Sequence, residues 1–182
     1  MIRSDLYPIF GLAVLMAVTR FHHFAFLPDA SLAVFFLAGL FWTSPWILAL
    51  FLAEAGLIDY LAVTYGGVNS WCITPAYAFL IPTYGVLWLG GRLSRGYSLD
   101  EALGIASVFA VLLGSALIAF GLSNISFYVL SGYFAELELK SYTIRVLPYL
   151  VPYLAAPLIY TASVLAARWA GKHWKFHLLK AS

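Results

Sequence analysis

Six long apolar blocks, separated by short stretches of turn-forming residues, determine what this chain can fold into. The blocks fall at about 6–21, 31–43, 46–64, 74–90, 101–122 and 146–169. Of the 182 residues, 63% are hydrophobic and only 10% are charged, against roughly 25% charged in soluble proteins. Since about 20 apolar residues cross a bilayer, we predict an all-α integral membrane protein, a bundle of six transmembrane helices that forms a single domain over residues 1–182.

The basic residues predict how this bundle lies in the membrane. Cytoplasmic loops accumulate Lys and Arg, and with both termini cytoplasmic the count is seven inside against three outside. The seven are Arg3, Arg92, Arg95, Arg168, Lys172, Lys175 and Lys180, and the three are Arg20, Lys140 and Arg145. We therefore expect both termini in the cytoplasm, with the connections 22–30, 65–73 and 123–145 together on the external face.

Charge and motifs also exclude whole classes of function. The net charge of +2 is small and scattered along the chain, so we expect no nucleic-acid partner. The chain has no GxxxxGK[ST] stretch, so we expect it to bind no nucleotide.

Two carboxylates lie inside the third apolar block, where an ionised group must face protein or water rather than lipid. For Glu54 we favour a hydrogen-bonding role between helices. For Asp59, nearer the external end, we favour ligand contact, with pairing to Arg20 or Arg145 as the alternative.

The lone cysteine, Cys72, lies just before Thr74 and Pro75, a pair typical of a helix start. A helix N-terminus favours the thiolate, which binds metals and attacks electrophiles. The alternative is a small packing residue without reactivity. Asn69 and Tyr77 flank Cys72 at the same predicted rim of the bundle.

Two further pairs of residues are candidates for the site and its partners. His22 and His23 occupy the first external connection, but adjacent side chains point in different directions, so a shared metal site is weakly indicated. Ala13 and Ala17 form a small-xxx-small face on the first helix, which allows another helix to approach closely.

These features together resemble the S-components of energy-coupling-factor vitamin transporters, which bind a vitamin outside the cell and reorient in the membrane. More narrowly, the segment 58–60 (IDY) followed by 65–77 (YGGVNSWCITPAY) looks like the solitary cobalamin transporters called BtuM. The resemblance spans the chain, and its specificity rests on the part from Asp59 to Tyr77.

The resemblance implies cobalamin binding and uptake across the bacterial inner membrane, with Cys72 as axial ligand of the cobalt. It also implies Asp59 and Tyr77 as pocket residues, and Ala13 and Ala17 as the face that couples to a separate ATPase module. A soft thiolate suits a polarizable transition metal. On topological grounds we add His22, His23 and Arg145 to the binding site, and we include Asn69 because it precedes Cys72 at the outer rim.

Two alternatives remain at this point. The chain could be an S-component for a smaller vitamin, in which Cys72 would be passive. It could instead be an intramembrane thiol enzyme that uses Cys72 with His22 or His23 as base, although such a pair needs hydrogen-bonding reach and an orienting group. We favour a transporter over an enzyme.

Overall fold

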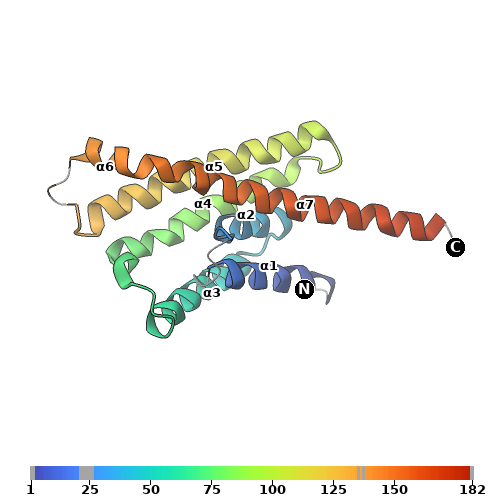
Figure 1. The fold of residues 1–182 in the computed structure, drawn as a ribbon. Coiled ribbons are helices and arrows are strands. Elements are labelled where there is room, and N and C mark those ends of the chain that lie inside the picture. Colours follow the sequence, from blue (N-terminus) through green and yellow to red (C-terminus); the bar gives the residue numbers. More distant parts are fainter. Residues whose placement is uncertain (1–2, 21–26, 135, 137, 181–182) are drawn as a thin grey trace.

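The computed structural model describes residues 3–20, 27–134, 136 and 138–180, and this part of the chain is helical and contains no strand (Figure 1). The predicted all-α class is confirmed. In chain order the elements are α1 (Arg3–Arg20), α2 (Ser31–Phe41), α3 (Pro45–Thr64), the 3₁₀ segments η1 (Ser70–Cys72) and η2 (Pro75–Phe79), α4 (Leu80–Leu93), η3 (Ser94–Gly96), α5 (Ala102–Leu130), α6 (Leu139–Val146), η4 (Leu147–Tyr149) and α7 (Leu150–Lys180).

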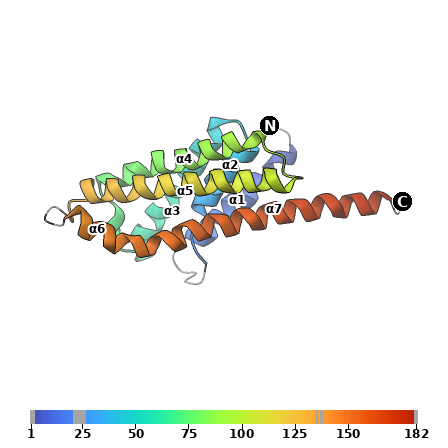
Figure 2. The ribbon, with the colours of Figure 1, turned by 90° about the horizontal axis from the view of Figure 1, so that it is seen from above.

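Membrane character is supported by three helical stretches of the described chain that are long and apolar enough to cross a bilayer. They are Pro45–Thr64, Ala102–Leu130 and Leu139–Lys172. The apolar stretches Leu6–Arg20 and Ser31–Phe41 are shorter. Six spans and the side on which the termini lie therefore stay predictions, although α1 begins and α7 ends toward the same end of the bundle in both views (Figures 1 and 2).

The shortest of the predicted spans, α2, is the centre of the core. At 1.5 Å per residue, its 11 residues reach about 16 Å, roughly half of the hydrocarbon thickness. Residues 33–40 are all buried, as expected of a helix that is apolar on every side. The other helices therefore enclose α2, and it meets little or no lipid.

Glycines allow α2 and α4 to pack backbone to backbone. A Cβ added at Gly39 would overlap the carbonyl of Trp88, and one added at Gly91 would overlap the carbonyl of Phe36. Close crossings on small residues are a common way to hold membrane helices together. This crossing fixes α4, and with it the residues that precede α4, against the core.

Two helix boundaries differ from those predicted. α5 continues to Leu130 rather than ending at 122, because Asn124 donates back to the carbonyl of Phe120 at 2.9 Å and Ser126 to that of Ser123 at 2.9 Å. Polar side chains bonded within the helix in this way do not end it. At the other boundary, the α-helical part of the fourth block begins only at Leu80, because residues 75–79 form the 3₁₀ segment η2.

Candidate functional site

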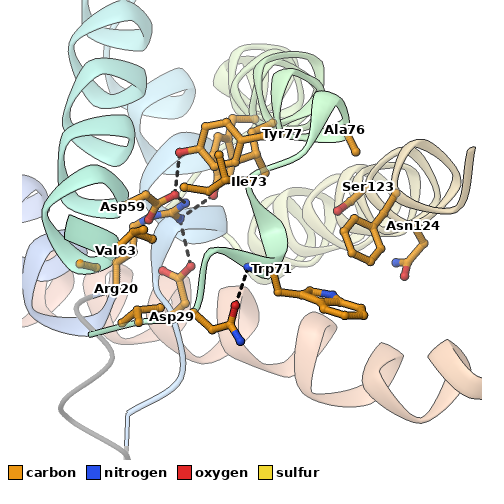
Figure 3. Close-up of a pocket in the computed structure, with 16 residues that line it drawn as sticks. Arg20, Asp29, Asp59, Val63, Trp71, Ile73, Ala76, Tyr77, Ser123 and Asn124 are labelled. Atoms are coloured by element: carbon orange, nitrogen blue, oxygen red, sulfur yellow. Dashed lines mark hydrogen bonds and ion pairs between the residues drawn. The ribbon is translucent and has the colours of Figure 1, made fainter. Parts of the chain in front are cut away.

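A cavity of about 620 Å³ opens where α1, α3, α4 and α5 meet the η1 and η2 segments (Figure 3). Its volume lies in the range of small-molecule and cofactor sites. Most of the wall is apolar or aromatic, and a few polar side chains converge on it. The lining residues are Arg20, Asp29, Asp59, Ala62, Val63, Val68, Asn69, Trp71, Ile73, Ala76, Tyr77, Leu80, Tyr84, Ser123, Asn124 and Phe127.

Arg20, the last residue of α1, organises the polar side of this cavity. Its Nε and Nη2 donate to the two carboxylate oxygens of Asp59 at 2.7 and 2.6 Å, a bidentate pair. Its Nη1 lies 3.2 Å from a carboxylate oxygen of Asp29, 3.0 Å from the Ser31 hydroxyl and 2.6 Å from the Tyr84 hydroxyl. The Arg20 side chain is only 9% exposed, whereas Asp59 is 23% and Asp29 46% exposed.

Asp59 joins α3 to η2 as well as to α1. The hydroxyl of Tyr77 donates to Asp59 Oδ2 at 2.7 Å. Asp59 Oδ1 accepts from Arg20 Nε and Oδ2 from Arg20 Nη2, so both carboxylate oxygens are already engaged by protein donors. Of the two roles weighed for Asp59, the structure combines pairing to Arg20 with a place on the cavity wall. We call Arg20, Asp29, Asp59, Tyr77 and Tyr84 the arginine cluster.

Local hydrogen bonds hold the short segments that carry this cluster. Asp29 accepts from the backbone N–H of Ser31 at 2.8 Å and from its hydroxyl at 2.6 Å, which fixes the turn before α2. Thr74 caps η2 by accepting from the N–H of Ala76 at 3.3 Å, with Pro75 following it. The predicted helix start at Thr74 is therefore present, although it opens a five-residue 3₁₀ segment rather than the α-helix.

The segment that includes Cys72 runs along the cavity wall. Asn69 caps η1 by accepting from the N–H of Trp71 at 2.9 Å. Cys72 is the last residue of η1, and both of its chain neighbours, Trp71 and Ile73, line the cavity. The side chain of Cys72 itself lies outside the described part of the structure. Its backbone position is next to the cavity.

Aromatic side chains from the α5–α6 connection cover the same end of the bundle. The indole of Trp71 stacks on the ring of Tyr133, with centroids 3.9 Å apart and planes 9° apart. Phe127 lines the cavity and lies 6.1 Å from Tyr133, ring centroid to ring centroid. The connections 65–73 and 123–145 therefore meet at one end of the bundle.

The remaining predicted residues lie away from the cavity or outside the described part of the chain. His22 and His23 fall outside the described residues. Arg145 is exposed on α6 and is not among the described residues that line the cavity. Ala13 and Ala17 are half-buried on α1, and Ala13 packs against the core.

Several lining residues were not predicted from sequence. Asp29 belongs to a Leu-Pro-Asp turn, where an aspartate is ordinary turn chemistry. Ser123 and Asn124 lie in a stretch that we took for a loop, and Tyr84 lies within an apolar block. Arg20 was weighed only as a possible partner of Asp59, although an arginine in the last turn of an apolar block is a sequence signal that could have placed it in the site.

No cluster of three or more His, Cys, Asp or Glu side chains that could hold a metal ion is found among the described residues. The chain matches no protein-family model, and comparison with curated proteins gives no match.

Proposed function

We propose that this chain binds cobalamin in the cavity and carries it across the bacterial inner membrane. The observation that supports the proposal most is the bond between Asp59 and Tyr77, at 2.7 Å, on the wall of the cavity. These two residues are the ends of the segment on which the resemblance to BtuM-like transporters rests. Their meeting at one cavity supports the proposal that this segment forms part of the ligand site.

The lining chemistry suits a corrinoid. A corrinoid is a broad, mostly apolar macrocycle with amide side groups, so it needs apolar and aromatic walls with a few polar contacts. Trp71 and Phe127 provide aromatic surface, and Asn69, Ser123 and Asn124 provide hydrogen-bonding groups. A cavity of about 620 Å³ would enclose one face of the macrocycle, and the remainder would occupy its open mouth.

Cys72 is the residue that we propose as axial ligand of the cobalt. A single thiolate from the protein would complete the coordination of a metal that the corrin ring already holds, so no cluster of protein ligands is needed. Trp71 and Ile73 on either side of it line the cavity. Binding in this way replaces an axial ligand of cobalt by sulfur, and the coordination of the bound cofactor differs from that of the free one.

Transport requires the loaded protein to pass its ligand inward. We propose that α1 presents Ala13 and Ala17 to a separate energy-coupling ATPase module, because small residues let a partner helix approach closely. Both side chains are half-buried rather than enclosed.

A smaller vitamin is the second candidate, because the volume of the cavity is also ordinary for a drug-sized ligand. Titration of the detergent-purified protein separates the two. Cobalamin should bind at one equivalent and survive gel filtration, whereas vitamins of smaller size should not compete. Failure of folded protein to retain cobalamin would refute the proposal, and Asp100→Asn, at the opposite end of the bundle, provides a control that should bind normally.

A further inference from the structure

A second cavity, of about 530 Å³, lies between α5 and α7 at the end of the bundle opposite to the proposed cobalamin site. In Figure 1, α7 crosses α5 and diverges from it toward its C-terminal end, and in both views α7 extends beyond the rest of the bundle (Figures 1 and 2). Ile105 and Phe109 of α5 form one wall of the opening, and Ala162, Leu165 and Ala166 of α7 form the other. We call this opening the α5–α7 groove.

The groove is apolar along its length and charged at its mouth. Ala162 and Ala166 are exposed, and their small side chains, one turn apart on α7, leave room between the helices. Arg168, Lys172 and Asp100 lie at the mouth together with Trp169. An apolar slot between two helices that ends in basic groups has the form of a phospholipid site, with space for an acyl chain and cations for a phosphate.

The two cations at the mouth, Lys172 and Arg168, differ in how readily they could bind a phosphate. Lys172 donates to both carboxylate oxygens of Asp100, at 2.9 and 2.7 Å, so its charge is already matched. Arg168 forms no ion pair with a carboxylate in the described part of the chain, and its guanidinium lies over the ring of Phe41, 5.0 Å from the centroid. Stacking on a ring uses the face of the guanidinium and leaves the N–H groups at its edge able to bind a phosphate.

Charge at this end favours an anionic lipid over a zwitterionic one. Arg168 lies at the mouth of the groove, whereas Arg92, in the last turn of α4, and Arg95, in η3, are not among the described residues that line it. A basic residue near the headgroup region contributes about 1 kcal/mol of attraction to anionic lipid. From the shape of the groove and this charge we infer that the α5–α7 groove binds one anionic phospholipid, with an acyl chain between the helices and its phosphate on Arg168.

Native mass spectrometry of the detergent-purified full chain tests this inference with phosphatidylglycerol and phosphatidylcholine of identical acyl chains. We expect one retained phosphatidylglycerol and weaker binding of phosphatidylcholine. Arg168→Gln should reduce the phosphatidylglycerol affinity about fivefold and abolish the preference. Arg95→Gln, which removes a charge outside the groove, should behave as wild type.

Ala162→Phe tests the acyl chain, because a ring in the groove should weaken binding of both lipids equally. Ala166→Phe, one turn along the same wall, is the second variant if the first lowers the melting temperature. Equal losses in the Arg168→Gln and Arg95→Gln variants would mean general charge attraction and overturn the inference. Unchanged lipid binding in the groove-filling variants would also overturn the inference. The groove would then be a candidate contact site for a partner helix.

Discussion

Replacing Asp59 with asparagine removes the charge that pairs with Arg20 while it keeps the size of the side chain. In the native structure Asp59 accepts two hydrogen bonds from Arg20, at 2.7 and 2.6 Å, and one from Tyr77, at 2.7 Å. The Arg20 side chain is 9% exposed. The variant therefore removes one carboxylate partner of a buried guanidinium, while Asp29, at 3.2 Å, remains as another.

The expected loss of stability in Asp59→Asn follows from the burial of the Arg20–Asp59 ion pair. Removing one partner of a buried ion pair costs about 3–5 kcal/mol. Asp59 is 23% exposed and Arg20 keeps Asp29, so we expect the free energy of unfolding to fall by about 2–3 kcal/mol. For a chain of this length that corresponds to a melting temperature lower by about 4–12 °C.

The chain contains a matched control for this experiment. Lys172 and Asp100 form a pair of similar length, 2.7 Å, but their side chains are 65% and 66% exposed. Exposed pairs contribute about 0–1 kcal/mol, so Asp100→Asn should lower the melting temperature by at most about 4 °C. Thermal unfolding of both variants in the same detergent measures the difference. Equal shifts would refute the argument that burial of Arg20 sets the effect.

The same Asp59→Asn variant also reports on ligand contact. Because protein donors engage both carboxylate oxygens, we expect cobalamin affinity to fall by less than about tenfold, which is 1.4 kcal/mol. A larger loss of affinity without a loss of stability would show that Asp59 contacts the ligand directly and that its pairing with Arg20 is secondary.

Three further changes test the packing, the coupling face and the cavity wall. Gly91→Ala should destabilise the fold by about 1–3 kcal/mol or more, because its Cβ would overlap backbone of α2, whereas Gly85→Ala on the same helix meets no atom within 4 Å and should be neutral or stabilising in the same unfolding assay. The double change Ala13→Leu and Ala17→Leu should impair cobalamin uptake by cells but leave binding in detergent intact; lost binding would assign this face to internal packing. Trp71→Ala, which removes a stacked ring from the cavity wall, should weaken cobalamin binding about tenfold in a titration, and unchanged affinity would place the ligand away from this wall.

The helical class was predictable because long apolar blocks in a chain with so few charged residues are typical of membrane-spanning helices. The helix ends were harder to predict, since Asn124 and Ser126 satisfy their hydrogen bonds within α5 and so lengthen it where composition suggests a loop. For α2 the apolar block suggested a membrane span, but the helix is too short to cross the bilayer and is enclosed by other helices. An apolar block predicts burial, but it does not distinguish burial in lipid from burial among other helices.

The sequence predicted the segment that lines one side of the candidate site, but it did not predict how the residues of the cavity come together. The stretch from Asp59 to Tyr77 follows from the sequence, and these two residues do meet. Arg20 and Asp29 join them from a different helix and a turn, and their convergence depends on how α1 and α2 pack on α3. The order of residues along the chain does not predict that packing.

The visible spectrum of cobalamin bound to the wild-type protein and to Cys72→Ser tests the central proposal most directly. Serine keeps the size of the side chain but removes the soft sulfur donor. We predict that cobalamin bound to the wild-type protein has a spectrum unlike that of the free cofactor, and that the spectrum in Cys72→Ser returns toward the free form. Identical spectra in the two proteins, with cobalamin bound to both, would contradict cobalt ligation by Cys72.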